Sequence, residues 1–153
     1  MDGIERLKRF IKEKSVDAEI IRTDDSVDSS HKTASAINEP EDLIAKSICL
    51  TDGSQMPIVV ILSGNHKIDL KKLRKELKLK NLRLANDDEL LRLTGYERGG
   101  IPPIGYEARF IMEKDLLDRP VLYCGGGTKN SILKIRPGEI IRIDKPEMMD
   151  IKR

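Results

Sequence analysis

The chain has 153 residues, which suits one domain with a sizeable core, and we expect a single domain over 1–153. Its composition is 39% hydrophobic and 35% charged, which excludes a disordered chain, and no apolar run is long enough to span a membrane. The net charge of +2 does not by itself indicate a nucleic-acid binder, although local clusters can still make one. The chain does not open on a signal-peptide pattern, and its two cysteines lie outside any CxxC motif. We therefore expect a cytoplasmic protein with buried thiols.

Hydrophobic periodicity divides the first half of the chain into helices and strands. Apolar residues three and four positions apart predict an amphipathic helix at the start, and alternation predicts the strand that follows. A polar loop then precedes a short helix, which Glu39-Pro40 interrupts. In chain order we predict a helix over 2–15, a strand over 16–23, a helix capped by Thr33 that continues through Ile37, an alternating apolar run over 43–50, and a central strand over 57–62 that is buried on both faces.

The second half carries clear helix-capping signals. Asp69 precedes leucines at helical spacing, Asn86 to Glu89 forms a capping box, and Gly95 suits the end of that helix. Alternating segments predict strands on both sides of the GGGTKN turn. We predict helices over 69–78 and 86–95, strands over 82–84, 107–112, 120–124 and 131–135, a short helix over 137–141, and a polar tail.

This order of elements predicts the fold class. Strands and helices are interspersed without regular βαβ alternation, which indicates an α+β fold with a mixed sheet curled around a core. The core must be aliphatic, because the chain has only two phenylalanines, three tyrosines and no tryptophan.

Two common kinds of catalytic site are poorly supported. The only histidines, His31 and His66, fall in polar loops, and a G-x-S-x-G elbow is absent from the sequence, so a Ser-His-Asp triad is not indicated. The histidines and cysteines are scattered and lack the spacing of zinc ligands. We therefore expect loop histidines, packed thiols and no metal.

Two further features each have a simple and a functional interpretation. GGGTKN follows a strand as a phosphate cradle would, but it lacks the P-loop spacing and leads into another strand, which favours an ordinary glycine hairpin. The helix over 69–78 has a basic face, for which solvation is the simpler interpretation and a phosphate contact the functional one. That face consists of Lys71, Lys72, Arg74, Lys75 and Lys78.

Lys46 and the run GGIPPIGY at 99–106 are less ordinary. Alternation places Lys46 on the same face as Ile44 and Ile48, where a lysine either extends to the edge of the apolar surface or is a cation held in a cleft. GGIPPIGY is neither helix nor ordinary strand, because proline fixes φ and lacks a backbone donor while glycine opens φ. The run is either a rigid connector or the wall of a site.

Several motifs occur in one order along the chain. They are Thr33-Ala-Ser-Ala36, Ile44–Ile48 with Lys46, Thr94–Gly105, the Gly125-Gly-Gly turn and Leu133–Pro137. Together they resemble the YbaK/ProX family of aminoacyl-tRNA deacylases and the editing insertion domain of bacterial prolyl-tRNA synthetases. The resemblance extends over about 7–143, and the G-x-x-x-P from Gly99 to Pro103 is its most specific part. It implies an α+β domain built on a mixed, barrel-like β-sheet with flanking helices.

The resemblance also implies a function. We expect a freestanding deacylase that acts in trans, without metal or cofactor, and hydrolyses the ester of a mischarged tRNA, with tRNA(Pro) carrying a small non-cognate amino acid as the first candidate. Its partner would be the aminoacyl-tRNA acceptor end, with prolyl-tRNA synthetase as a second partner and no membrane. Lys46 would hold the terminal adenosine or its phosphate, and the loop would place backbone groups around the amino acid and water. The family motif assigns Lys46, Gly99, Gly100 and Pro103 to catalysis, and Thr33, Ile101, Pro102, Gly105, Gly126 and Gly127 to substrate binding.

A second class of function stays open at this point. A domain of the same fold could be a non-catalytic module that binds a tRNA end, a nucleotide or a synthetase. Some family members carry an acid in the strand after the Gly-Gly turn, whereas Ser131-Ile132-Leu133 has none. The sequence therefore leaves open which amino acid is removed.

Overall fold

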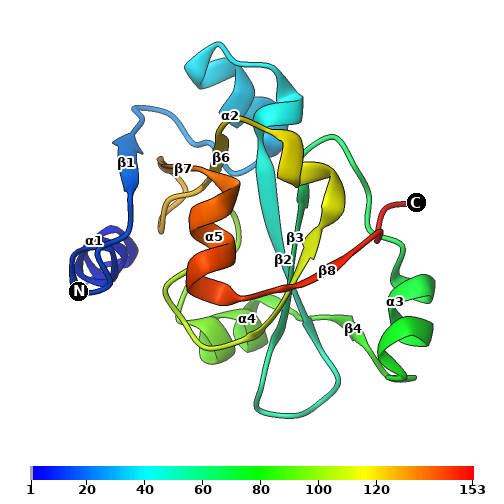
Figure 1. Cartoon of the computed structure of the whole chain (residues 1–153). Helices are drawn as coiled ribbons and strands as arrows, with labels where there is room; N and C mark the ends of the chain where they lie inside the picture. Colours follow the sequence, from blue (N-terminus) through cyan, green and yellow to red (C-terminus); the bar gives the residue numbers. More distant parts are fainter. Residues whose placement is uncertain (1) are drawn as a thin grey trace.

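The computed structural model describes residues 2–153, which form helices packed around two β-sheets (Figure 1). The α-helices are α1 (Gly3–Glu13), α2 (Ser30–Ile37), α3 (Leu70–Leu77), α4 (Asp87–Thr94) and α5 (Pro137–Asp144), with short 3₁₀-helices at Glu41–Leu43 and Lys114–Asp118. The strands are β1 (Ala18–Arg22), β2 (Ala45–Thr51), β3 (Ile58–Ser63), β4 (Arg83–Leu84), β5 (Arg109–Glu113), β6 (Leu122–Gly125), β7 (Ser131–Ile135) and β8 (Glu147–Met149). None of the helices over 2–153 has the length and apolar character needed to cross a membrane.

The two sheets differ in their strand directions. The smaller has the order β1-β7-β6 and is antiparallel throughout. The larger has the order β4-β2-β3-β5-β8, with antiparallel pairs around β2 and parallel pairs on both sides of β5. The predicted α+β class with a mixed sheet is confirmed.

The barrel-like closure expected from the resemblance is wrong, because the sheets are not closed into a barrel. Closing a barrel requires a continuous hydrogen-bonded ladder around the sheet. Over the described residues, no hydrogen-bonded ladder joins β2 to β6, and an isolated bridge connects Ile44, just before β2, to Tyr123 of β6. On that same edge, β4 pairs with β2 only at Leu50 and Thr51. Most of one edge of β2 is therefore left open.

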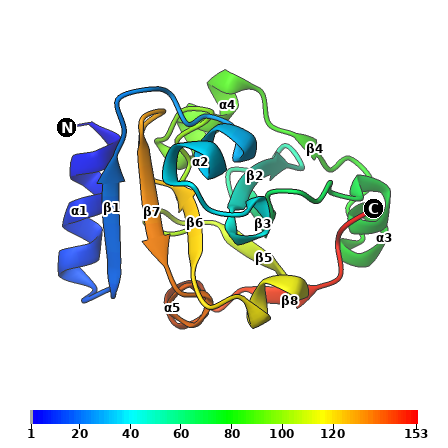
Figure 2. The ribbon, with the colours of Figure 1, turned by 90° about the horizontal axis from the view of Figure 1, so that it is seen from above.

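The larger sheet is covered by apolar side chains on both faces, and β3 lies at its centre. Val59 and Ile61 point into the cluster shared with the smaller sheet, whereas Val60 and Leu62 point into the cluster beneath α3. All six residues of β3 are buried, which confirms the predicted central strand. Figure 2 shows the resulting order, from α1 and the smaller sheet at one end of the molecule to α3 at the other.

The capping signals predict the helix ends well, with one correction. Asp69 caps α3, the capping box of Asn86 begins α4, and Gly95 ends α4 in the left-handed conformation. Thr33, however, is not a cap. Ser29 caps α2 by accepting a hydrogen bond from the Lys32 amide, and Thr33 lies inside the helix.

Two other differences come from weak local patterns. His31 was expected in a loop but lies in the first turn of α2. The polar tail contains the strand β8, which pairs in parallel with β5 and carries an ion pair between Arg109 and Glu147. The pattern of β8 is weak because it has three residues and none of them is buried.

Candidate active site

A pocket of about 310 Å³ lies along the open edge of β2. Residues 45–49 of β2 form one wall, and residues 27–29 with the start of α2 form another. The remaining walls come from Leu84–Ala85, the loop that begins at Arg98, and the end of β6. The pocket exists because β6 leaves β2 after one bridge, so that neither backbone nor core side chains fill the space between them.

Lys46 lines this pocket from β2. It is half-buried, pairs with Leu62 of β3 in the strand register, and its Nζ donates a hydrogen bond to the carbonyl oxygen of Gly64 at 3.4 Å. Burial lowers the pKa of Lys46, while the negative charges of Glu113 and Glu41 oppose that effect. Lys46 is therefore a partly desolvated cation beside a cavity.

The loop over 99–103 packs backbone to backbone against the turn that follows β6. Gly99 has a φ of +87°, in the left-handed region that favours glycine. A Cβ at Gly125 would lie 2.1 Å from the carbonyl oxygen of Ile101, so this contact requires glycine. The Gly127 amide donates to the carbonyl oxygen of Gly100 at 2.8 Å. The sequence motif thus encodes a close junction of two loops at one end of the pocket.

The structure brings some of the predicted site residues together and leaves others behind the pocket wall. Lys46, Thr33, Gly99 and Ile101 line the pocket, together with Gly125. The other six predicted residues do not line it: Gly100, Pro102, Pro103, Gly105, Gly126 and Gly127. Their assigned roles, like those of the lining residues, stay predictions.

The residues behind the wall hold the loops in place. The Tyr106 hydroxyl donates to the carbonyl oxygen of Pro102 at 2.7 Å, and Pro103 is buried. Gly105 lies against Leu7 of α1. The Gly126 amide donates to the carbonyl oxygen of Ser131 at 3.1 Å, which closes the turn before β7.

Thr33, which was predicted to cap α2, instead lines the pocket from inside that helix. Its side chain is buried, and its hydroxyl donates to the carbonyl oxygens of Val27 and Ser29 at 3.0 and 2.9 Å. These bonds hold the segment before α2 against the pocket.

The sequence interpretation did not single out several pocket residues. Ser47 is the most informative, because its buried hydroxyl oxygen has no hydrogen-bond partner within 2–153 and the residue lines the pocket. Alternation along β2 places Ser47 on the face opposite Lys46, but the open strand edge lets both residues reach the cavity. Arg98 also lines the pocket and donates to the Asp87 carboxylate at 2.6 Å. The sequence signal available for Ser47 was its position next to Lys46, and for Arg98 its position next to Gly99.

The two cysteines lie in the pocket wall but are not poised to react. Both are buried and free, as the prediction of packed thiols required. Burial raises the pKa of Cys49 to about 11 and also raises the pKa of Cys124. Since the thiolate is the nucleophilic form, both thiols stay in the unreactive form at neutral pH.

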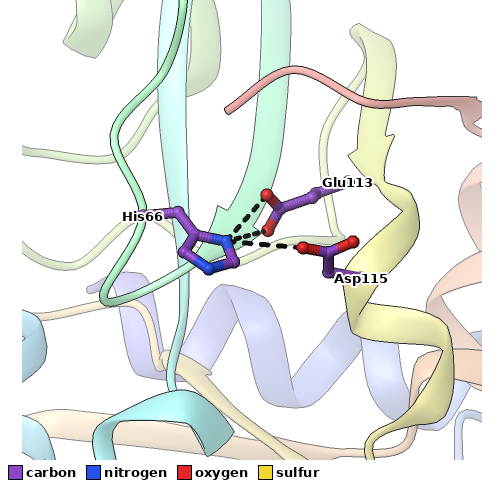
Figure 3. Close-up of side chains that lie close together, drawn as sticks. All are labelled: His66, Glu113 and Asp115. Carbon is purple, nitrogen blue, oxygen red and sulfur yellow. Dashed lines mark hydrogen bonds and ion pairs between the residues drawn. The ribbon is translucent and has the colours of Figure 1, made fainter. Parts of the chain in front are cut away.

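A second polar cluster consists of His66, Glu113 and Asp115 (Figure 3). His66 Nδ1 is 2.8 Å from a carboxylate oxygen of Glu113 and 3.9 Å from one of Asp115. These three side chains have the chemistry of metal ligands, although the Lys152 ammonium pairs with Asp115. The sequence interpretation missed this cluster, because His66 and Glu113 are 47 residues apart and meet only through the pairing of β3 with β5.

With the fold and the pocket described, comparison with known proteins defines the class. The family described as aminoacyl-tRNA editing domain matches residues 24–143, and the chain belongs to this family. The class is a hydrolase that acts on the ester bond of aminoacyl-tRNA. The predicted aminoacyl-tRNA deacylase, related to prolyl-tRNA synthetase editing, is thereby confirmed.

Individual relatives agree with this class. The chain is 24% identical over 125 residues to an Enterococcus faecalis protein named "Putative Cys-tRNA(Pro)/Cys-tRNA(Cys) deacylase EbsC", with 80% of this chain and 76% of that protein covered. It is 37% identical over 79 residues to the proline–tRNA ligase of Lactobacillus gasseri, a match that covers 52% of this chain and 14% of the ligase. A crystal structure described as a "putative trans-editing enzyme for prolyl tRNA synthetase" has the same fold, with a TM-score of 0.91 and 23% identity over 100% of this chain and 98% of that one.

Proposed function

We propose that the pocket beside Lys46 holds the aminoacylated 3′ end of a tRNA, and that the protein removes a small non-cognate amino acid from tRNA(Pro) in trans, in the cytoplasm. The observation that carries this proposal is the meeting of Lys46, Gly99 and Ile101 in one pocket of about 310 Å³. That volume is at the small end for ligand pockets and suits a small aminoacyl group with part of the ribose. The names of the Enterococcus relative and of the ligase support tRNA(Pro) as the first substrate to test.

The reaction needs few groups. Water adds to the ester carbonyl carbon, the bond to the ribose oxygen breaks, and a proton passes to that oxygen as the amino acid leaves. Lys46 would hold the terminal adenosine or its phosphate and so fix the ester beside the loop. The backbone of the loop, held rigidly against the glycine turn, would stabilise the charge that develops on the carbonyl oxygen. A single donor of this kind is typically worth about 10²–10³ in rate.

An editing site of this kind has a clear physical purpose. A binding pocket separates amino acids that differ by one methylene by only about 10–200-fold, so a synthetase that needs more accuracy depends on a second, hydrolytic site. The Ser47 hydroxyl is buried and has no hydrogen-bond partner over the residues that the structure describes, so it supplies a polar group in the same pocket for the amino group or the ribose.

The test is a panel of mischarged tRNAs. We expect release of alanine, cysteine or serine from tRNA(Pro) and little release of proline from its cognate tRNA. Lys46→Ala should lower kcat/KM by about 100-fold or more, because a charge-bearing contact to the substrate is lost. An unchanged rate in this variant would refute the role of Lys46. Saturable tRNA binding without turnover on any member of the panel would identify a binding module instead.

A further inference from the structure

We infer that Glu113 is a positioning residue for Lys46. Together with His66, Glu113 holds the turn after β3 that carries the hydrogen-bond acceptor of Lys46. Glu113 also supplies a negative charge on the same face of the sheet as the lysine. This inference rests on the proposed function of Lys46. It assigns a role in the site to a buried acid that lies outside the pocket wall.

The first step is the burial of Glu113. It lies at the end of β5 and its side chain is only 1% exposed. A carboxylate at such a site is costly unless its oxygens are satisfied. Here the Ser63 amide donates to Oε1 at 2.9 Å, and His66 Nδ1 lies 2.9 and 2.8 Å from the two oxygens. Ser63 ends β3 and His66 follows the turn at 64–65, so the carboxylate holds the residues on both sides of that turn.

The second step is what the turn does. Between the two anchored residues, the Gly64 amide donates to the carbonyl oxygen of Ile44 at 2.6 Å, and its own carbonyl oxygen accepts the hydrogen bond from Lys46. A Cβ on Gly64 would lie 2.7 Å from the Ser30 hydroxyl oxygen, so the turn is tightly packed against the first residue of α2. Movement of this turn would therefore move the acceptor of Lys46.

The third step is electrostatic. Lys46 pairs with Leu62 across β2 and β3, and Ile61 pairs with Met112 across β3 and β5. Glu113 follows Met112 just as Leu62 follows Ile61, so Glu113 lies beside Leu62 in the parallel register. Lys46, Leu62 and Glu113 therefore form one row across the sheet, on the same face. Its negative charge is the largest influence that opposes the lowering of the Lys46 pKa by burial. Glu41 acts in the same direction and Lys67 in the opposite one.

The remaining neighbours complete the arrangement. Asp115 lies beside His66 (Figure 3), with its Oδ2 3.9 Å from His66 Nδ1. The Lys152 ammonium pairs with Asp115. With a cation already on Asp115, the geometry favours a network of hydrogen bonds and ion pairs over a metal centre. The two interpretations make different predictions for added metal.

The experiment measures the ionisation of Lys46 directly. Lysine side chains are labelled with ¹³C at the ε position, the Lys46 signal is assigned by its loss in Lys46→Arg, and its pKa is read from an NMR titration. Glu113→Gln keeps the shape of the side chain and removes the charge, so we expect the Lys46 pKa to fall below its wild-type value. Glu113→Asp retains the charge and should recover much of the difference. The matched control is Glu19→Gln, an exposed acid on β1, which should leave Lys46 unchanged.

Activity provides the second readout. On mischarged tRNA, Glu113→Gln should lower kcat/KM by roughly 10- to 100-fold, as expected for a misplaced catalytic group, and the loss should grow as pH rises. If Glu113→Gln does not fold, His66→Ala removes one contact of the carboxylate from a partly exposed position, and we expect kcat to fall several-fold with little change in KM.

The outcomes separate this inference from the proposed function. If Lys46 is essential for turnover but its pKa and the rate are the same in Glu113→Gln and wild type, the inference is refuted and the function stands. If the Lys46 pKa falls and no mischarged tRNA is hydrolysed, the function is refuted while the electrostatic link holds. Saturable Zn²⁺ binding that is lost in His66→Ala, with a rate that depends on Zn²⁺, would refute the positioning role in favour of a metal site.

Discussion

The two edges of β2 show how this fold separates stability from function. On one edge, residues 45–50 form an unbroken ladder with β3, the most buried strand described. On the other edge, the single bridge from Ile44 to Tyr123 is followed by a pocket. The same strand is thus part of the core on one side and a wall of the site on the other.

The difference lies in how each edge is specified. The paired edge depends on many interchangeable aliphatic contacts, which tolerate changes that conserve volume. The open edge depends on a few contacts that admit one residue type, such as Gly125 against the carbonyl oxygen of Ile101. Substitutions at the open edge should therefore have large, local effects on activity.

The most damaging change we expect at the open edge is Gly125→Ala. Its Cβ would lie 2.1 Å from a backbone oxygen that cannot rotate away, so the loop over 99–103 must move. We expect a loss of about 3 kcal/mol in the free energy of unfolding, measured in urea, and loss of most deacylase activity. The matched control is Gly138→Ala in α5, where a Cβ meets nothing within 4 Å. It should stabilise the protein by about 0.5 kcal/mol, and equal losses in the two variants would contradict a specific requirement for glycine at Gly125.

Much of the fold could be predicted from the sequence, because its signals are local. Capping residues such as Asp69 and Asn86 act within one helical turn, and the unbroken apolar run of β3 reports burial on both faces. Thr33 was misassigned because Ser29 offers an equivalent cap four residues earlier. The closure of the sheet could not be predicted, since it depends on how far β6 follows β2 and not on the residues of either strand alone.

The candidate site was less predictable for the same reason. Motif order pointed to Lys46 and to the Gly99 loop, which do line one pocket. The motif did not distinguish residues that line the pocket from those that brace it, such as Pro103 and Gly126. Glu113 and His66 carry no local signal, because they come together only through strand pairing.

Asp144 of α5 lies outside the pocket and provides a test of how a buried carboxyl affects stability. Its carboxyl group is largely buried at the end of α5, Oδ2 has no hydrogen-bond partner among the described residues, and burial raises its pKa from 3.8 to about 8. Between these values the folded protein keeps a proton that the unfolded chain releases, so the free energy of unfolding should fall as pH rises from about 4 to 8.

Asp144→Asn should remove most of this pH dependence. We expect the variant to be more stable than wild type by about 1–3 kcal/mol near pH 8, and about equally stable near pH 4, as measured by urea unfolding at each pH. Asp24→Asn, an exposed loop acid, is the control and should retain the wild-type profile. A wild-type stability that rises over this interval would show that the buried carboxyl is ionised in the folded protein.

The smallest effect that we predict concerns the basic face of α3, which lies at the far end of the molecule from α1 (Figure 2). Lys71 and Lys75 are exposed and one helical turn apart, so replacing both with alanine should change stability by less than about 0.5 kcal/mol. If this face contacts tRNA phosphates, KM for mischarged tRNA should rise about two- to fivefold at unchanged kcat, with a weaker dependence on salt. Lys8 and Lys12 form an equivalent exposed pair on α1, and their double alanine variant is the control. A similar rise in KM for both double variants would assign the effect to overall charge. If KM rises for neither, the α3 face is a solvated surface and recognition is confined to the acceptor end in the pocket.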